Sequence, residues 1–285
     1  MALVSIVIPC YQAGAYLVEA VESALAQRGV EVEVVVVDDG STDEATLDAL
    51  RRVAAMPGVR CFSQSNAGPA AARNHAIREA RGDYILPLDA DDRFDPGYAA
   101  AAEAVLRDDP SVGIVYCHAA KFGASEGAWS LPAYTPQEMA IDNVIFCSGM
   151  FRKADWAAVG GYDEALRHGM EDYEFWLRLM GLGRRVVQLP GTLFHYRILP
   201  SSRTTRFMAV RPQVIDTYAH IFRRHQAFFA EHAETLYAFR FRQQQELEHF
   251  RHRYGQIDQV LERMSWLKSI GRLVNRVLGW WFRSK

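Results

Sequence analysis

The chain has 285 residues, a mass of 32.2 kDa and a net charge of −2, and 49% of its residues are hydrophobic. This composition is typical of a globular chain with one large domain, or a domain with a small addition, and it excludes wholesale disorder and collagen-like repeats. No apolar run approaches the roughly 18 residues that a membrane-spanning helix needs.

The small net charge conceals an uneven distribution. Residues 1–206 carry 27 acidic and 19 basic residues, a balance of −8, whereas residues 207–285 carry 7 and 13, a balance of +6. An acidic body followed by a basic tail suggests two roles. We predict a catalytic domain over residues 1–206 and a helical extension over residues 207–285.

Residues 1–9 contain no basic residue, so they indicate a buried strand rather than a signal peptide. The four cysteines lie far apart and have neither zinc-finger nor disulfide-framework spacing. We therefore expect a reducing, cytoplasmic compartment.

The first ninety residues alternate between two kinds of hydrophobic pattern. Short apolar runs predict strands at residues 3–9, 32–37, 59–63 and 84–88. Periodic or alanine-rich stretches predict helices at residues 16–26, 43–54 and 69–81, the second capped by Ser41 or Thr42. This alternation predicts an α/β domain with a mostly parallel central sheet, helices on both faces and ligands beyond the carboxyl ends of the strands.

The middle of the chain is less regular. Its patterns predict helices at 96–106 and 170–180, a loop at 125–135 and strands at 112–117, 186–189 and 193–197. From about residue 207 the pattern is helical to the end.

The strongest chemical signal is the turn Leu88-Asp89-Ala90-Asp91-Asp92, which follows a predicted buried strand. Its carboxylates repel one another, and a divalent cation would relieve that repulsion. Hard oxygen ligands suit Mg²⁺ or Mn²⁺, which commonly also hold substrate phosphates. A solvated turn that caps the next helix is the competing interpretation, and the place after a strand favours the metal.

Three further motifs carry functional groups. The turn VDDGSTD (37–43) offers carboxylates to a base or ribose, or caps a helix. In NAGPAAARN (66–74), Gly68 permits close backbone approach to a ligand and Arg73 suits a phosphate or base, although an arginine on a helix is usually a surface residue. The acidic pair in MEDYEFW (170–176) fits either a helix start or a general base.

Taken together and in this order, SIVIPCY, VVDDGSTD, NAGPAAARN, LDADD and GGYDE…EDYEFWLR resemble family 2 glycosyltransferases over about residues 3–206. The resemblance implies a GT-A fold that binds a nucleotide sugar and transfers a hexosyl or N-acetylhexosaminyl group with inversion. UDP-sugars are the default donors, with dTDP- and GDP-sugars left open. The implied acceptor is a glycan or a lipid-linked sugar of bacterial surface polysaccharide synthesis.

The resemblance also implies residue roles on the donor side. Pro9 and Tyr11 would line the nucleotide pocket, Asp39 would bind the base, and Arg73 and Asp89 would lie near the nucleotide.

Asp89 and Asp91 form the D-x-D motif that would hold Mn²⁺ or Mg²⁺, with Asp91 as the more direct ligand. Asp172 would be the base that deprotonates the acceptor, with Glu171 as the reserve candidate.

One segment departs from the family pattern. Many relatives carry a histidine shortly after the dipeptide that corresponds to Tyr196-Arg197, and this chain has Ile198-Leu199-Pro200 and then two serines instead. A third protein ligand to the metal is therefore not implied. The groups that remain for the diphosphate are Arg197, Ser201, Ser202 and Arg203.

Two other function classes are compatible with parts of the pattern. A non-catalytic nucleotide-sugar or glycan-binding subunit would keep the GT-A fold, but it would have no chemical need for Asp89, Asp91 and Asp172 together. A nucleotidyltransferase would need a glycine-rich basic loop near the N-terminus, and the chain has none. We expect no nucleic-acid partner.

The tail has two parts. Residues 207–263 mix charged and aromatic residues at helical spacing, which suits packing on the catalytic domain or a homo-oligomer contact. Residues 265–285 place apolar residues on one helical face, with five basic and no acidic residues. Such a helix either docks on protein or lies on an anionic membrane. We favour the membrane, at the inner face of the cytoplasmic membrane.

Overall fold

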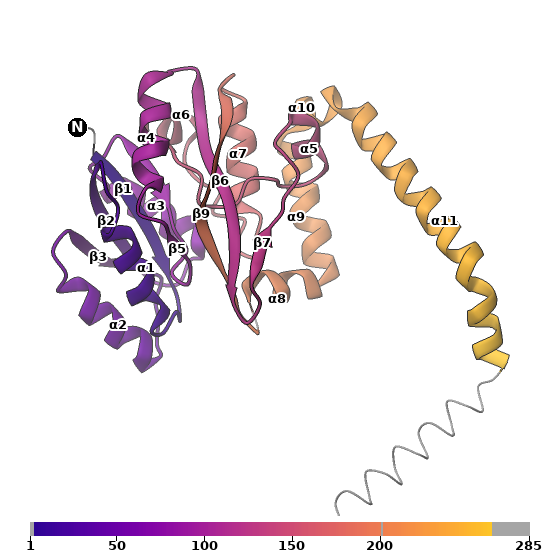
Figure 1. Ribbon diagram of the computed structural model, residues 1–285, viewed down its shortest axis with the longest axis horizontal. Coiled ribbons are helices and arrows are strands. Elements are labelled where there is room, and N and C mark those ends of the chain that lie inside the picture. The colour runs from indigo at the N-terminus through magenta and orange to yellow at the C-terminus, as the bar shows by residue number, and fades with distance from the viewer. Residues whose placement is uncertain (1–2, 201, 264–285) are drawn as a thin grey trace, which may run out of the picture. The chain divides into compact units, whose positions relative to one another are not determined.

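The computed structural model describes residues 3–200 and 202–263 (Figure 1). Tertiary contacts divide the chain into two compact units, Met1–Ala230 and Glu231–Lys285. Residues 207–230, which the sequence analysis assigns to the helical extension, therefore lie in the same unit as residues 1–206. The predicted amphipathic helix over 265–285 lies outside the described residues.

The first unit contains a five-stranded sheet with the order β3-β2-β1-β4-β8. β1 to β4 are parallel and β8 is antiparallel to β4. Residues 34–37 of β2 are fully buried valines, as expected for a strand covered on both faces. The strands are β1 (Leu3–Cys10), β2 (Glu31–Asp38), β3 (Val59–Ser63), β4 (Tyr84–Pro87) and β8 (Phe151–Arg152).

The strand order indicates where a ligand is expected to bind. The chain steps from β1 to β2 to β3 in one direction and then returns past β1 to β4. Because such crossovers are right-handed, α1 (Tyr16–Leu25) and α2 (Glu44–Ala54) lie on one face of the sheet and α3 (Pro69–Glu79) on the other. Ligands bind where the strand order reverses, so the residues that follow β1 and β4 border the expected site.

A second, four-stranded sheet has the order β5-β9-β6-β7. β6 and β9 are parallel, whereas β5 pairs with β9 and β7 pairs with β6 in antiparallel fashion (Figure 1). Its strands are β5 (Arg93–Phe94), β6 (Val112–Gly123), β7 (Gly127–Trp129) and β9 (Arg185–Ile198). The helices of this part are α4 (Tyr98–Asp108), α5 (Pro136–Ile141), α6 (Lys153–Val159) and α7 (Glu171–Met180).

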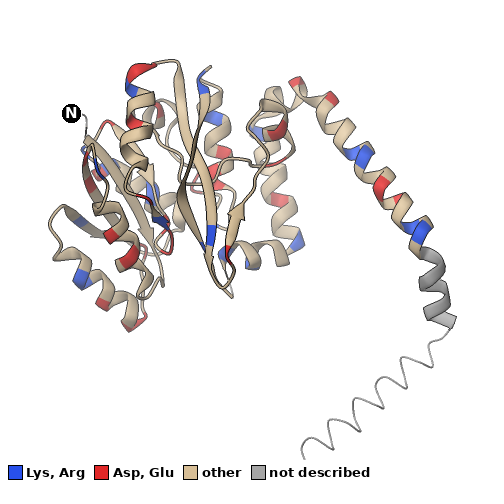
Figure 2. Cartoon of the chain, in the orientation of Figure 1, with Lys and Arg blue, Asp and Glu red and all other residues tan. Residues whose placement is uncertain are grey.

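The described part of the tail is helical, as predicted. It consists of α8 (Arg203–Ala209), α9 (Arg211–Arg224), α10 (Gln226–Glu231) and α11 (Ala233–Arg263). Basic and acidic residues both occur along the coloured part of α11 (Figure 2). Among the helices of residues 3–200 and 202–263, none combines the length and the apolar character needed to cross a membrane.

The strands and helices predicted up to residue 88 are confirmed. Four details differ from the prediction: the cap of α2, the end of β6, the loop at 125–135 and the strands at 186–189 and 193–197. Asp43, rather than Ser41 or Thr42, caps α2 by accepting a hydrogen bond from the Thr46 amide at 2.8 Å. The strand predicted at 112–117 continues to residue 123, and the loop predicted at 125–135 contains β7.

The two short strands predicted at 186–189 and 193–197 are one strand, β9. Pro190 and Gly191 lie where the pairing with β6 is irregular, between the pairs Gln188–Tyr116 and Thr192–His118. A proline without an amide proton is tolerated at such a bulge, so the Pro-Gly pair does not end the strand.

Candidate active site

The acidic turn lies at the carboxyl end of β4, as predicted. Leu88 is fully buried, and the Asp92 amide donates to the Asp89 carbonyl at 3.1 Å, which closes the turn. Burial, with the Asp89 charge as a further cause, raises the pKa of Asp91 to about 6. Two carboxylates are thus held close together in a partly desolvated place, which disfavours their joint ionisation in the absence of a cation.

These residues fit a hard divalent cation. Asp89 and Asp91 offer carboxylate oxygens, and within the described part of the chain no cluster of three or more His, Cys, Asp or Glu side chains is arranged to hold a metal by itself. Two protein carboxylates, completed by water and substrate phosphates, are a common arrangement for Mg²⁺ and chemically similar ions.

Arg73 joins the acidic turn to the acidic pair of α7. Its guanidinium is fully buried, donating from Nη2 to Asp89 Oδ1 at 2.5 Å and from Nη1 to Glu171 Oε1 at 2.7 Å. The Tyr162 ring lies 5.7 Å from the guanidinium carbon. Arg73 was predicted to lie near the nucleotide. In the structure its hydrogen-bond partners are the two carboxylates, and a place near the nucleotide stays a prediction.

Glu171 is held as a permanent anion. Its carboxylate is 1% exposed and accepts hydrogen bonds from Arg73 at 2.7 Å and from Arg203 at 2.8 Å. Burial would raise its pKa, but the charges of Arg203 and Arg73 prevail and lower it to about 2. A group with so low a pKa is a poor proton acceptor near neutral pH, so Glu171 serves the site as a counter-ion.

Asp172, the next residue, is in the opposite situation. The residue as a whole is partly exposed, and burial of its carboxylate together with the neighbouring Glu171 charge raises its pKa to about 6. Asn143 Nδ2 donates to Asp172 Oδ2 at 3.2 Å, and the Tyr173 amide donates to Oδ1 at 2.8 Å. An accessible carboxylate with a pKa close to neutral is suited to general-base catalysis.

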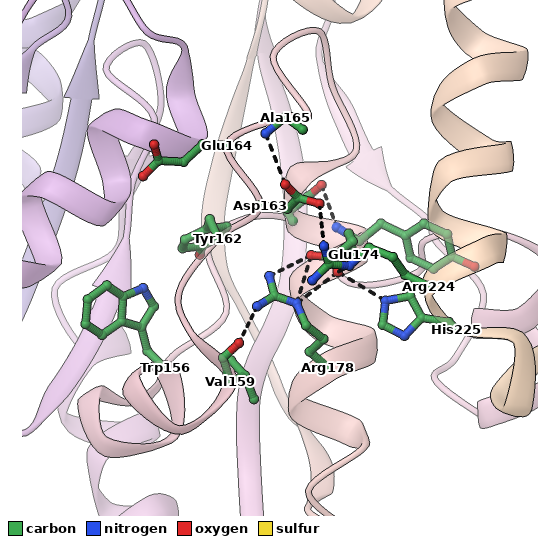
Figure 3. Close-up of polar contacts among 12 residues, drawn as sticks. Trp156, Val159, Tyr162, Asp163, Glu164, Ala165, Glu174, Arg178, Arg224 and His225 are labelled. Atoms are coloured by element: carbon green, nitrogen blue, oxygen red, sulfur yellow. Dashed lines mark hydrogen bonds and ion pairs between the residues drawn. The ribbon is translucent and has the colours of Figure 1, made fainter.

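A cluster of charged side chains fixes α7, which carries this pair. Glu174, with a fully buried side chain, accepts from Arg178 at 2.6 Å and is paired with Arg224 at 3.1 Å and His225 at 3.2 Å (Figure 3). Arg224 also reaches Asp163 at 3.2 Å. We call these five residues the α7–α9 clamp, because they tie the base-bearing helix to α9.

Three residues predicted to contact the nucleotide lie at or just beyond the carboxyl ends of β1 and β2. Pro9 is the penultimate residue of β1, and Tyr11, just beyond the strand, is 54% exposed. Asp39 is 3% exposed and accepts from the amides of Ala67 and Gly68, each at 2.8 Å. Asp39 therefore shapes the loop before α3, and a contact with the base stays a prediction.

Arg197 braces the acidic turn. Its Nε donates to the Asp91 carbonyl and its amide to Asp92 Oδ1, both at 2.7 Å. The guanidinium is paired with Glu19 and stacks over Phe122 at 4.2 Å. These contacts engage the side chain, and its role toward the diphosphate stays a prediction.

The other three residues predicted for the diphosphate follow one another in the chain. Ser202 is the N-cap of α8, where its Oγ accepts from the Thr205 amide at 3.1 Å. Ser201 lies outside the described residues. Arg203 follows Ser202, and its Nη1 atom is buried and has no hydrogen-bond partner.

The segment 143–147 was not recognised from the sequence. Asn143 contacts Asp172, and at the other end Cys147 Sγ lies 3.5 Å from Asp89 Oδ2. The segment thus spans the distance between the candidate base and the acidic turn. No motif marks it, because its role depends on tertiary contacts alone.

Comparison with known families gives two matches. Residues 5–158, more than half of the chain, match "Glycosyl transferase family 2". Residues 84–282 match "Glycosyl transferase family group 2".

The chain is similar to parts of larger polysaccharide synthases. A chondroitin synthase of Escherichia coli is 33% identical over 185 residues, which cover 64% of this chain and 27% of that protein. A hyaluronan synthase of Pasteurella multocida is 31% identical over 190 residues, 64% of this chain and 19% of that protein. The chain therefore spans a minor part of the length of these relatives.

Solved structures share the fold. S. aureus TarS 1–349 in complex with UDP-GlcNAc has a TM-score of 0.63 and 20% identity, covering 84% of this chain and 73% of that one. The mannosyltransferase PcManGT from Pyrobaculum calidifontis, in complex with GDP-Man and Mn²⁺, has a TM-score of 0.56 and 20% identity, covering 82% and 74%. The predicted GT-A fold is thereby confirmed, and the chain belongs to glycosyl transferase family 2.

Proposed function

We propose that this protein transfers a sugar, with inversion, from a nucleotide diphosphate sugar to a hydroxyl group of a glycan or lipid-linked acceptor. A UDP-sugar is the proposed donor, and Mn²⁺ or Mg²⁺ the proposed cofactor at Asp89 and Asp91. The product would belong to cell-surface polysaccharide synthesis. The relatives support this choice, since they include chondroitin and hyaluronan synthases and a structure in complex with UDP-GlcNAc.

One observation carries the proposal: a buried arginine connects the two acidic motifs and pairs with Glu171, which leaves Asp172 as the proton-accepting member of the Glu171–Asp172 pair. Arg73 binds Asp89 on one side and Glu171 on the other. The cation-binding turn and the base are therefore held at a defined separation by a rigid link, as a displacement between a donor and an acceptor requires.

The proposed reaction is a single in-line displacement. The acceptor oxygen attacks the anomeric carbon while the bond from that carbon to the diphosphate oxygen breaks, and the acceptor proton passes to Asp172. The nucleoside diphosphate leaves with the bonding electron pair. A bound divalent cation would offset the charge that develops on this leaving group. The unpartnered Nη1 of Arg203 offers a further donor to the diphosphate, beside Arg197, Ser201 and Ser202.

A donor screen tests the proposal. Purified protein is incubated with Mn²⁺ and a panel of UDP-, dTDP- and GDP-sugars, and release of nucleoside diphosphate is measured with and without EDTA. We expect one donor class to be hydrolysed in a metal-dependent and Asp172-dependent way. Release of pyrophosphate would instead indicate nucleotidyl transfer, and binding without turnover would indicate a non-catalytic subunit.

The tail completes the proposal. We propose that residues 265–285 hold the enzyme at the inner face of the cytoplasmic membrane, where a lipid-linked acceptor would be available. The stretch carries five basic residues and no acidic one, and each basic residue near an anionic surface contributes about 1 kcal/mol. Residues 207–263 are the proposed surface for a homo-oligomer.

A further inference from the structure

An aromatic pair stands beside the acidic turn and has no part in the proposed reaction. The rings of Trp129 and Tyr196 lie 4.5 Å apart at 37°, and both side chains are partly exposed. In the second sheet Trp129 of β7 is paired with Ala119 of β6, and Tyr196 of β9 with Lys121. Ala119 and Lys121 point to the same face of β6, because side chains alternate along a strand.

The pair rests on the buried core. The Phe146 ring, 6% exposed, lies 5.9 Å from Trp129 at 26° and 4.6 Å from Phe194. Phe194 is fully buried. Trp129 is therefore supported by a packed aromatic layer, although the preceding residues of β7 are exposed.

The same layer is connected to both halves of the catalytic site. Phe146 belongs to the segment 143–147, in which Asn143 donates to Asp172 and Cys147 contacts Asp89. Tyr196 immediately precedes Arg197, whose amide donates to Asp92 Oδ1 and whose Nε donates to the Asp91 carbonyl, both at 2.7 Å, so this part of β9 lies beside the acidic turn. The aromatic pair thus borders the region between the candidate base and the donor-binding carboxylates.

We infer that Trp129 and Tyr196 form the wall on which a pyranose ring of a glycan acceptor stacks. This inference rests on the proposed function and adds the chemical class of the acceptor. The donor belongs to the switch point between β1 and β4, which leaves the side of the second sheet for the acceptor. A pyranose presents a face of C–H groups to an aromatic ring and hydroxyls at its rim, and one of these must reach Asp172. A partly exposed tryptophan on a rigid support suits that ring.

The test separates acceptor from donor effects. Three variants are compared with the wild-type protein: Trp129→Ala, Trp129→Phe and the control Tyr237→Ala, which lies at an exposed position of α11. The donor found in the screen is used with water as acceptor and then with a panel of p-nitrophenyl pyranosides. For Trp129→Ala we expect KM for the pyranoside to rise about tenfold, with KM for donor hydrolysis unchanged. Trp129→Phe should recover most of the loss, and Tyr237→Ala should behave as wild type.

Several results would overturn the inference. One is a wild-type protein that hydrolyses donor but transfers to no pyranoside of the panel. Another is an equal rise of both KM values in Trp129→Ala, which would indicate a general distortion of the site. A third is efficient transfer to a polyprenyl phosphate that Trp129→Ala leaves unchanged, which would indicate a lipid acceptor without a stacked sugar. Absence of donor hydrolysis in the wild type would instead refute the proposed function on which the inference depends.

Discussion

The guanidinium of Arg73 and the carboxylate of Glu171 are 98 residues apart in the chain, yet they meet at 2.7 Å with both side chains buried. Removing one member of such a pair leaves an uncompensated buried charge. The contact fastens α3 to α7 and helps to keep Glu171 ionised, and burial together with that charge raises the pKa of the adjacent Asp172.

Asp172→Asn should separate turnover from donor binding. Without the carboxylate, no side chain takes up the proton of the acceptor hydroxyl, so we expect kcat to fall about 10²- to 10⁴-fold. The donor Kd measured by calorimetry should stay near the wild-type value. Asp91→Ala should instead abolish Mn²⁺-dependent donor binding. Equal loss of donor affinity in both variants would show that Asp172 belongs to the donor site.

The pH profile of transfer should report the same carboxylate. Asp172 acts as a base only when deprotonated, and its pKa is about 6, so kcat should decrease as the pH falls below that value. In Asn143→Ala the carboxylate loses a hydrogen bond that stabilises its charged form, so the acidic limb should move to higher pH. An acidic limb unchanged in Asn143→Ala would assign the titration to another group.

Arg197 and Arg93 provide a matched pair for the acidic turn. Both guanidiniums pair with Glu19 and lie over Phe122, at 4.2 and 4.3 Å, but Arg197 also donates to the Asp91 carbonyl. We expect Arg197→Ala to weaken Mn²⁺-dependent donor binding about 10- to 100-fold, the range for residues that support metal ligands. Arg93→Ala should have a much smaller effect. Similar losses of donor affinity in the two variants would argue against a role of Arg197 in supporting the acidic turn.

Glu174 of the α7–α9 clamp should be important for stability. Its side chain is fully buried, so Glu174→Ala should lower the free energy of unfolding by about 3–5 kcal/mol. Burial raises the pKa of Glu174, but hydrogen bonds from His225 and Arg178 prevail and lower it below the ordinary 4.5. Its contribution is therefore present above pH 4.5 and lost as the pH falls through the lowered pKa.

The control for this prediction is Glu44→Ala. The Glu44 side chain is 83% exposed, so its replacement should change the free energy of unfolding by less than about 0.5 kcal/mol. Urea denaturation at pH 7 and at pH 3.5 measures both variants. A difference between wild type and Glu174→Ala that does not shrink in acid would show that packing, rather than charge, is the origin of the effect.

Deletion of residues 265–285 should release the protein from anionic liposomes without changing hydrolysis of soluble donor. The five basic residues of the stretch would be attracted by the negative headgroups, so high salt should weaken binding of the full-length chain. Sedimentation with phosphatidylglycerol vesicles measures the attachment, and phosphatidylcholine vesicles are the control. If the full-length chain binds neither kind of vesicle and the truncated chain is monomeric or unstable, the stretch docks on protein instead.

The sequence by itself determined the α/β order and the chemistry of the acidic motifs. Strands such as β2 are recognisable because a strand buried on both faces must be uniformly apolar. The turn at Asp89 and the pair at Glu171 are recognisable because each lies next to a predicted strand or helix end. These are local features, which depend on residues that are neighbours in the chain.

Only the tertiary structure decided which carboxylate has which role. Glu171 and Asp172 are chemically alike and adjacent. Burial would raise the pKa of Glu171, but the charges of Arg203 and Arg73 prevail and lower it, whereas burial and the charge of Glu171 raise the pKa of Asp172. The contact of Asn143 with Asp172 and the stacking of Trp129 likewise join residues that are distant along the chain. Desolvation and charge pairing depend on three-dimensional proximity, which no local pattern encodes.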